Sequence, residues 1–318
     1  MPELPEVQNT VDGIRAHVLG RTITHVWTDY NSPHYHGKQN IKDPAYFRTF
    51  KKRTTGRTII DVTRRAKQIF ITLDDESIIA VHMKMTGHFL YGQWDWNRSK
   101  HKWQPPAGFW DKQWDITREE VKKTMPFSDP FNDFIHLMFD LDDGSQLAFS
   151  DMRKFATISL LESYDEYLEM ARHYGPEPLQ PRLSFGGFME RLQTKPNMMV
   201  KPALLDQSLV AGFGNIYSDE VLWAAGVHPE SIVSHIPEKQ WNDIFTHGKR
   251  ILRSAIKHGG DSMGDYRRID GTGGTFQGMH QVYQRDGQPC NRCGNIIEKK
   301  QIGQRIGRLC SGCQQFFG

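Results

Sequence analysis

The four cysteines constrain this chain more than any other feature, because all of them lie within the last 29 of its 318 residues. They form two Cys-x2-Cys pairs, Cys290 with Cys293 and Cys310 with Cys313, and 16 residues separate the pairs. Two such pairs present four thiolates to one Zn²⁺ with tetrahedral geometry, usually from the tips of two β-hairpins. A four-cysteine site leaves no open coordination position. The sequence therefore predicts one structural zinc ion in a zinc-ribbon-like finger over residues 284–318.

The first 289 residues contain no cysteine, which argues against a disulfide framework and favours a reducing compartment. No apolar run reaches 18 residues, so we predict no membrane span. The acidic, proline-bearing N-terminus lacks the basic leader and the apolar core of a signal peptide. We expect a cytoplasmic protein.

Basic residues are concentrated in two segments of a chain whose net charge is only +3. Residues 51–67 carry seven basic side chains against one acid, and residues 285–318 carry six against two. Clusters of this kind are typical of solvated surface, and they also suit a polyanionic partner. The charge pattern leaves both interpretations open.

Hydrophobic periodicity predicts a mostly β domain with a leading helix over residues 1–165. Val7, Val11, Ile14 and Val18 recur at helical spacing before Gly20. Strand-like runs follow at 58–62, 69–73 and 78–83. Alternating apolar residues at 135–141 then lead through Asp-Asp-Gly into QLAF, which indicates a β-hairpin. We expect two packed sheets.

Residues 91–130 do not follow this pattern and contain five of the eight tryptophans: Trp94, Trp96, Trp103, Trp110 and Trp114. They fit either a satellite cluster packed on the β domain or an aromatic surface facing a ligand or partner.

The second half of the chain reads as helical. A linker at 166–185 contains YGPEPL, and apolar residues from Trp241 to Ile256 then fall on one helical face. A glycine-rich polar loop follows at 259–279. We therefore assign residues 186–283 to a helical domain, which makes the whole chain α+β.

Two stretches of this half have features of an anion-binding site. The GFGN turn at 212–215 delivers Asn215 and backbone N–H groups to a helix N-terminus, although a tight helix connection without a ligand has the same pattern. The segment between the cysteine pairs places cations on a rigid hairpin, namely Lys299, Lys300, Arg305 and Arg308.

The opening MPELPEV suggests covalent chemistry if Met1 is removed, because Pro2 then has a free secondary amine. An α-amino group has a reference pKa of about 7.7–8.0, against about 10.4 for lysine, so much more of it is unprotonated at neutral pH. Such an amine is a ready nucleophile for an electrophilic sugar carbon, and Glu3 beside it can exchange a proton.

Taken together, these segments resemble formamidopyrimidine-DNA glycosylases in the same order along nearly the whole chain outside residues 91–130. The matching motifs are PELPEV at 2–7, RRAK at 64–67, HMKMTG at 82–87, DMRKF at 151–155, GPEPL at 175–179, GFGNIYSDE at 212–220 and the zinc module. The resemblance implies an N-terminal β-sandwich, a helix–two-turn–helix domain and a zinc finger. It also implies a bifunctional DNA glycosylase and abasic-site lyase that removes oxidised purines from double-stranded DNA. Such an enzyme would act as a monomer on DNA with oxidised bases or abasic sites and, in a prokaryote, would be associated with the nucleoid.

The resemblance also assigns roles to individual residues. In the catalytic centre it implies that Pro2 attacks C1′, that Glu3 protonates the sugar ring oxygen and that Glu6 supports the site. The residues that would grip phosphates flanking the lesion are Lys67, Asn215 and Arg305. The residues that would fill the space of the extruded nucleotide are Met85, Arg153 and Phe155, and Lys201 matches a lysine associated with lesion handling.

Some features depart from the family pattern or leave alternatives open. Lys84 stands beside Met85 where we expect a small residue. The loop at 259–279 has about the length of the flap that covers extruded 8-oxoguanine. An endonuclease VIII-like enzyme acting on oxidised pyrimidines is the rival within this fold, although Leu4 favours the purine-directed branch. A lesion-binding protein without catalysis is the alternative from a different class.

Overall fold

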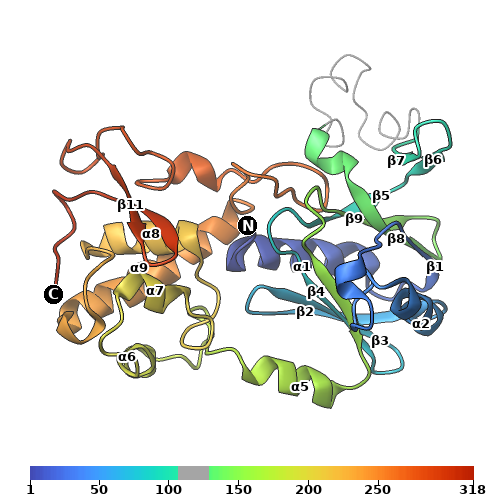
Figure 1. The fold of residues 1–318 in the computed structure, drawn as a ribbon, viewed down its shortest axis with the longest axis horizontal. Coiled ribbons are helices and arrows are strands. Elements are labelled where there is room, and N and C mark those ends of the chain that lie inside the picture. Colours follow the sequence, from blue (N-terminus) through green and yellow to red (C-terminus); the bar gives the residue numbers. More distant parts are fainter. Residues whose placement is uncertain (107–128) are drawn as a thin grey trace. The chain divides into compact units, whose positions relative to one another are not determined.

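The computed structural model describes residues 1–106 and 129–318, and the remaining segment is drawn as the grey trace in Figure 1. The chain forms two compact units. The N-terminal unit comprises Met1–Pro2, Glu6–Glu169 and Asp261–Gly274, and the C-terminal unit comprises Glu3–Pro5, Met170–Gly260 and Thr275–Gly318. Among the described residues, no helix has both the length and the apolar character that crossing a membrane requires.

The N-terminal unit is the predicted β-sandwich, with two four-stranded antiparallel sheets (Figure 1). One sheet has the order β1-β8-β9-β5, with strands Ile23–Thr28, Ile135–Leu141, Gln146–Ser150 and His88–Gly92. The other has the order β10-β4-β3-β2, with strands Thr157–Leu161, Ile78–His82, Gln68–Leu73 and Ile59–Arg65. The predicted strand runs and the 135–149 hairpin are confirmed.

The leading helix α1 (Leu4–Val18) packs into the core of this unit. Its predicted apolar face is confirmed, since Val7, Val11, Ile14 and Val18 are all buried. Gly20 follows with φ of 76°, a left-handed conformation that suits glycine after a helix end. Helix α2 (Pro44–Thr54) begins where Asp43 accepts a hydrogen bond from the Ala45 N–H at 3.0 Å.

Several tryptophans cover the face of the first sheet that points away from this core. Because strand residues alternate between faces, Leu137, Phe139 and Phe149 enter the main core while Met138 and Ala148 join a second cluster with Trp94. Trp27 and Trp103 pack against this second cluster, and the hairpin of β6 (Asp95–Asn97) and β7 (Lys102–Gln104) contributes to it. The satellite-cluster interpretation therefore holds for Trp94 and Trp103. Trp110 and Trp114 lie outside the described residues.

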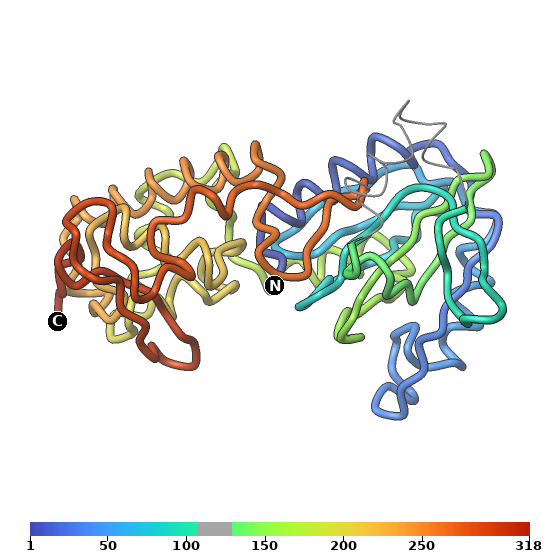
Figure 2. The backbone as a smooth tube through the Cα atoms, turned by 90° about the horizontal axis from the view of Figure 1, so that it is seen from above, coloured from blue at the N-terminus to red at the C-terminus, as the bar shows by residue number. Residues whose placement is uncertain are grey.

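Residues 261–274, within the loop predicted at 259–279, lie on the N-terminal unit. Tyr91 N–H donates to the Ile269 carbonyl at 2.9 Å, and Asn132 Nδ2 donates to the Gly271 carbonyl at 3.1 Å. Arg267 binds Asp129 at 2.6 Å. Figure 2 draws this segment in orange. The loop is therefore anchored at several points, while Met263 within it is exposed.

The C-terminal unit is helical, as predicted (Figure 1). The helices are α6 (Phe185–Gln193), α7 (Val200–Leu205), α8 (Asn215–Ala225) and α9 (Glu238–Lys257). Helix α5 (Tyr164–Arg172) precedes them and spans the boundary between the units. Of the predicted apolar face of α9, Trp241, Ile244 and Leu252 are buried in the core of this unit.

A two-stranded hairpin completes the C-terminal unit. Strands β11 (Glu298–Ile302) and β12 (Arg305–Leu309) pair antiparallel between the two cysteine pairs, as the zinc-finger prediction requires (red in Figure 2). Strand β12 contacts α8. Short 3₁₀ turns occur elsewhere in the chain at Pro33–Tyr35, Pro130–Asp133, Val233–His235 and Phe276–Met279.

Candidate functional site

The Glu3 carboxylate lies at the N-terminus of helix α8. Its Oε1 accepts a hydrogen bond from the Ile216 N–H at 2.9 Å, and its Oε2 accepts one from the Tyr217 N–H at 3.4 Å. The first N–H groups of a helix have no partner within the helix, and the helix dipole favours a negative charge there. The anion expected at the GFGN turn is therefore supplied by the chain itself.

Two glycines of this turn leave room for the N-terminal residues. A Cβ on Gly214 would lie 2.3 Å from the Glu3 carboxyl carbon, and a Cβ on Gly212 would lie 2.5 Å from Leu4. The Leu4 N–H also donates to the Gly212 carbonyl at 3.2 Å. The glycines are thus explained by close packing against Glu3 and Leu4, which the sequence alone did not reveal.

Pro2 is buried and directly precedes this fixed carboxylate, whereas Met1 is exposed. With Met1 in place, the Pro2 nitrogen is part of a peptide bond and has no proton or basic lone pair. Removal of the exposed Met1 is therefore a chemical requirement for any nucleophilic role of Pro2.

Glu6 is buried in the N-terminal unit, where its Oε1 accepts a hydrogen bond from the Asp261 N–H at 2.8 Å. Asp261 is the first residue of the 261–274 segment, so this bond ties one end of the segment to the start of α1. The buried Tyr266 hydroxyl lies 3.5 Å from Thr10 Oγ1 of the same helix. Glu6 thus anchors this loop, and its predicted part in the catalytic centre stays a prediction.

Three loops of the N-terminal unit carry the other predicted residues, and each contains a strained position. Ala66, Lys84 and Lys154 have φ values of 54°, 55° and 53°, a left-handed region that non-glycine residues rarely adopt. They adjoin Lys67, Met85 and the pair Arg153 and Phe155, respectively. Strained backbone of this kind persists where the surrounding structure determines it, and it is concentrated at functional sites.

Asp151 braces two of these loops. Its carboxylate is fully buried and accepts hydrogen bonds from the Thr86 hydroxyl, from the Tyr30 hydroxyl at 3.1 Å and from the Ala156 N–H at 2.9 Å. The Arg153 N–H donates in turn to Thr86 Oγ1 at 3.1 Å. The loop carrying Met85 and the loop carrying Arg153 are therefore fixed to each other.

Lys42 supports the same region from a distant part of the chain. Its ammonium donates to the Lys154 carbonyl at 2.6 Å and lies 4.7 Å from the centroid of the Tyr35 ring. Burial lowers the pKa of Lys42 to about 8, against a smaller opposing effect of Asp151. Lys42, Tyr30, Thr86 and Asp151 were not predicted as site residues. Thr86 and Asp151 lie within quoted motifs, whereas nothing local in the sequence marks Tyr30 or Lys42.

Three predicted residues stand at the surface of these braced loops. Arg153 and Phe155 are exposed, and the Arg153 guanidinium lies 4.5 Å from the centroid of the Phe155 ring. Met85 is partly exposed, whereas Lys67 is buried. An exposed aromatic ring of this size on a rigid loop is available to a partner.

Lys201 lies inside the C-terminal unit. Its ammonium binds Asp219 Oδ1 at 2.6 Å with both side chains fully buried, and it also donates to the Ile306 carbonyl at 3.3 Å. Asp219 Oδ2 accepts from the Arg308 N–H at 3.0 Å. Burial lowers the pKa of Lys201 and raises that of Asp219 to about 7, because it disfavours the charged form of both groups. This ion pair joins α7 and α8 to strand β12.

Not all of the cations that the sequence places on this hairpin are available to a ligand. Lys300 binds Glu230 at 2.5 Å, and Arg308 binds Asp286 at 3.2 Å. Arg305 is exposed and has no ion pair within residues 1–106 and 129–318. Across the unit at the start of α8, the buried Oδ1 of Asn215 makes no hydrogen bond within the described chain.

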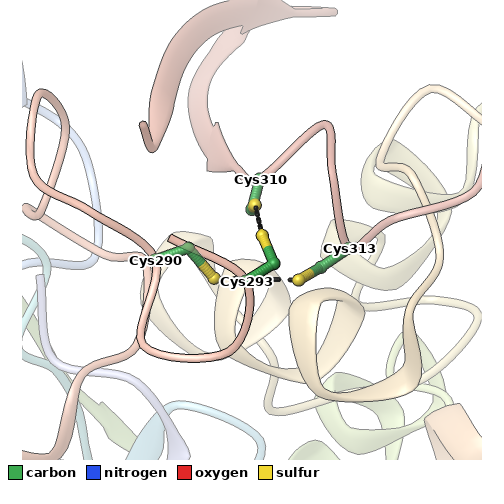
Figure 3. A group of neighbouring side chains, drawn as sticks. All are labelled: Cys290, Cys293, Cys310 and Cys313. Carbon is green, nitrogen blue, oxygen red and sulfur yellow. Dashed lines mark hydrogen bonds between the residues drawn. The ribbon is translucent and has the colours of Figure 1, made fainter. Parts of the chain in front are cut away.

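The four cysteines converge as the sequence predicted (Figure 3). Their sulfur atoms all lie within 4.8 Å of one another, with Cys293 and Cys310 3.4 Å apart and Cys290 and Cys313 3.7 Å apart. Four thiolates at about 2.3 Å from a tetrahedral zinc ion are separated by about 3.8 Å, so the geometry fits one structural Zn²⁺. N–H groups of Trp223 and Arg292 donate to Cys290 Sγ, both at 3.4 Å.

The predicted site residues divide between the two units. The N-terminal unit holds Pro2, Glu6, Lys67, Met85, Arg153 and Phe155. The C-terminal unit holds Glu3, Lys201, Asn215, Arg305 and the four cysteines. Pro2 and Glu3 are adjacent in the chain although they are grouped with different units.

Comparison with known proteins gives the same architecture. Residues 1–158 match the formamidopyrimidine-DNA glycosylase N-terminal domain, and residues 174–267 match the H2TH domain of the same enzymes. Residues 287–315 match the zinc finger found in FPG and IleRS. The four clustered cysteines lie within this last match, so the finger is a zinc-binding module.

Individual relatives match over essentially the full length. The formamidopyrimidine-DNA glycosylase of Streptococcus thermophilus is 34% identical, with 99% of this chain and 100% of the relative covered. Lactococcus lactis Fpg in complex with abasic-site DNA is 30% identical, with a TM-score of 0.77 and coverage of 99% and 100%. A second complex of that enzyme, with DNA containing an oxidised pyrimidine, has the same identity and coverage and a TM-score of 0.76. The chain belongs to the formamidopyrimidine-DNA glycosylase family and is a DNA-binding glycosylase of base-excision repair.

Proposed function

We propose that this glycosylase removes oxidised purines through a covalent intermediate on Pro2 and then cleaves the abasic site. The observation that carries the proposal is the Glu3 carboxylate, held at the N-terminus of α8 directly beside Pro2 in the chain. A proton-exchanging group fixed next to a secondary amine is the combination that amine catalysis at a sugar carbon requires.

The chemistry proceeds from the free amine of Pro2 after loss of Met1. The lone pair of the Pro2 nitrogen forms a bond to C1′ while the glycosidic bond breaks. The damaged base leaves with the electron pair of the glycosidic bond and takes up the proton that the Pro2 nitrogen releases. Glu3 gives a proton to the ring oxygen, which opens the sugar and produces an iminium. The iminium acidifies the C2′ proton, so β-elimination breaks the C3′–O bond and δ-elimination then breaks the C5′–O bond.

We propose that the surrounding predicted residues bind the distorted duplex. Lys67, Asn215 and Arg305 contact phosphates that flank the lesion. Asn215 would donate through its amide N–H groups at the start of α8, and the exposure of Arg305 is consistent with a ligand contact. Phe155 and Met85 fill the vacated space, and Arg153 hydrogen-bonds the orphaned base. Filling that space offsets part of the few kcal/mol needed to extrude a nucleotide.

Trapping with borohydride tests the covalent step. The Met1-processed enzyme should be reduced irreversibly onto abasic-site DNA, and a Pro2→Gly variant should yield a different amount of adduct at a different rate. The alternative, a lesion-binding protein without catalysis, gives no adduct. If the mature protein retains Met1 and is still fully active, the Pro2 mechanism is wrong.

The lesion preference needs its own experiment, because the solved complex of L. lactis Fpg with oxidised-pyrimidine DNA makes a pyrimidine activity a specific second candidate. We expect faster base release from 8-oxoguanine:cytosine than from thymine-glycol duplexes of the same sequence. Faster release of thymine glycol would assign the chain the pyrimidine preference instead. We further propose that the enzyme acts as a monomer in the cytoplasm.

A further inference from the structure

Lys84 occupies a backbone conformation that a glycine would adopt at lower cost. Its φ of 55° lies in the left-handed region, where the Cβ of an L-residue crowds the following carbonyl oxygen. Lysine offers none of the local side-chain hydrogen bonds that let asparagine or aspartate tolerate this region. A lysine at this position therefore needs an explanation from its side chain.

The neighbouring residues impose this conformation. The Gly87 N–H donates to the Met83 carbonyl at 3.1 Å, and the Lys84 N–H donates to His82 Nδ1 at 3.0 Å. A Cβ on Gly87 would lie 2.5 Å from the Phe149 ring, so the turn cannot shift in that direction. Thr86 is fixed by its bond to Asp151. The turn between β4 and β5 is therefore closed on both sides of Lys84.

The Lys84 side chain has cations around it and no anion bound to it. It is partly exposed, and its ammonium forms no hydrogen bond or ion pair within residues 1–106 and 129–318. Burial, with the charges of Lys84 and Lys67, lowers the pKa of His82 to about 3, so His82 is neutral and accepts through Nδ1. The charge of Lys84 also opposes protonation of Lys42. Bringing an anion here would relieve repulsion among these cations.

We propose that Lys84 is a further phosphate-binding residue, which extends the DNA contact surface of this chain between Lys67 and Met85. The assignment rests on the proposed placement of the lesion duplex against Lys67 and Met85. The backbone strain is then the cost of placing an ammonium directly beside the residue that fills the vacated space. Neutralising one phosphate releases condensed counterions, which makes the contact visible in the salt dependence of binding.

The test measures equilibrium affinity for an abasic-analogue duplex from 50 to 200 mM salt. Lys84→Gly and Lys84→Asn both tolerate the left-handed conformation without the charge, and Lys84→Arg keeps the charge. We expect the first two variants to reduce the magnitude of the slope of log K against log salt by about 0.9. The factor by which each variant binds more weakly than the wild type should therefore be roughly 3.5-fold smaller at 200 mM than at 50 mM salt. Lys84→Arg should keep the wild-type slope.

Lys239→Ala is the control for net charge, because Lys239 is exposed on α9 and pairs with its helix neighbour Asp243. Its slope should equal that of the wild type. A wild-type slope in Lys84→Gly and Lys84→Asn, or a slope lowered equally by Lys84→Arg, would overturn the proposal. Borohydride trapping at low salt separates this failure from failure of the enzymatic proposal, since the wild-type protein still forms its adduct when only the Lys84 assignment is wrong.

Discussion

At the scale of single residues, the site depends on small side chains as much as on reactive ones. The carboxyl group of Glu3 lies directly against Gly214, and a Cβ added to Gly214 would lie only 2.3 Å from the Glu3 carboxyl carbon. Glu3 receives its N–H donors from residues 216 and 217 only because the turn approaches so closely. The position of the Glu3 carboxyl group thus depends on the lack of a side chain at Gly214, which lies more than 200 positions away in the sequence.

Gly214→Ala should therefore displace Glu3 without removing any reactive group. We expect base release in single turnover to slow by about 10²-fold, the cost of misplacing a catalytic group by about 1 Å. Gly186→Ala is the control, since its Cβ would have only Ser184 Oγ at 4.0 Å. Equal zinc content and circular dichroism would establish that the fold is intact. Normal rates in a folded Gly214→Ala protein would show that Glu3 does not need this position.

Lys42 predicts a pH effect on stability. Because its pKa is about 8 in the folded protein and about 10.4 in an unfolded chain, the unfolded state binds more protons between these values. The free energy of unfolding of the wild type should therefore rise relative to Lys42→Met as the pH increases from about 8 towards 10.4. Urea denaturation of both proteins at several pH values measures this. A difference that falls or stays constant across the window would contradict the lowered pKa.

At the scale of elements, the buried ion pair between Lys201 and Asp219 explains how the hairpin keeps its place on the helices. Lys201 comes from α7, Asp219 from α8, and both bind the backbone of β12. A Cβ on Gly307 would lie 2.9 Å from the Lys201 ammonium, so a larger residue at this strand position would displace the ammonium. The contacts describe Lys201 as a positioning residue for the strand that carries Arg305.

Removing one partner of this pair should be costly, and removing both should not. We expect Lys201→Met to lower the free energy of unfolding by about 3–5 kcal/mol, because it leaves Asp219 buried without a counter-charge. In the double variant Lys201→Met, Asp219→Asn, the amide oxygen can still accept from the Arg308 N–H, and most of the stability should return. Chemical denaturation of the three proteins measures the difference.

Activity separates the two roles of Lys201. If the lysine acts through the hairpin, the double variant should regain lesion-DNA affinity and base release together with its stability. A double variant that is stable but still unable to process lesions would instead support the sequence-based expectation of a direct part in lesion handling.

Elements could be predicted from the sequence where the signal is local. The spacing of Val7 to Val18 predicts α1, and the alternation from Ile135 to Leu141 predicts β8, because each pattern repeats within a few residues. The spacing of the cysteines likewise predicts their convergence. The bracing of the loops could not be predicted, since Tyr30 meets Asp151 from 121 positions away and no sequence pattern near either residue signals this contact.

At the scale of the whole molecule, each compact unit includes a short segment from a distant part of the chain. Residues 261–274 were predicted within the helical domain at 186–283, yet they group with the N-terminal unit, and Glu3–Pro5 group with the C-terminal unit. The limits at 165, 185 and 283 stay predictions. These two segments group in this way because of long-range hydrogen bonds, between Glu6 and Asp261 in one unit and between Glu3 and Ile216 in the other.

Separate cores in the two units predict how the molecule responds to loss of zinc. The N-terminal unit has its own hydrophobic core, whereas the β11–β12 hairpin is closed at both ends by the cysteine pairs. In zinc-finger peptides metal binding contributes on the order of 10–16 kcal/mol to folding, so a chelator should unfold the hairpin while the sandwich remains folded.

We therefore expect chelation to abolish binding to lesion DNA, because Arg305 then loses its rigid support. Hydrogen exchange should become fast in residues 298–309 and stay slow in β2–β4 and β8–β10, and added zinc should restore both protection and affinity. The zinc content of each sample has to be measured alongside the affinity, since incomplete removal would mimic resistance. Full affinity in verified zinc-free protein would mean that the finger is dispensable for binding, and loss of protection in the sandwich strands would mean that the two units do not fold independently.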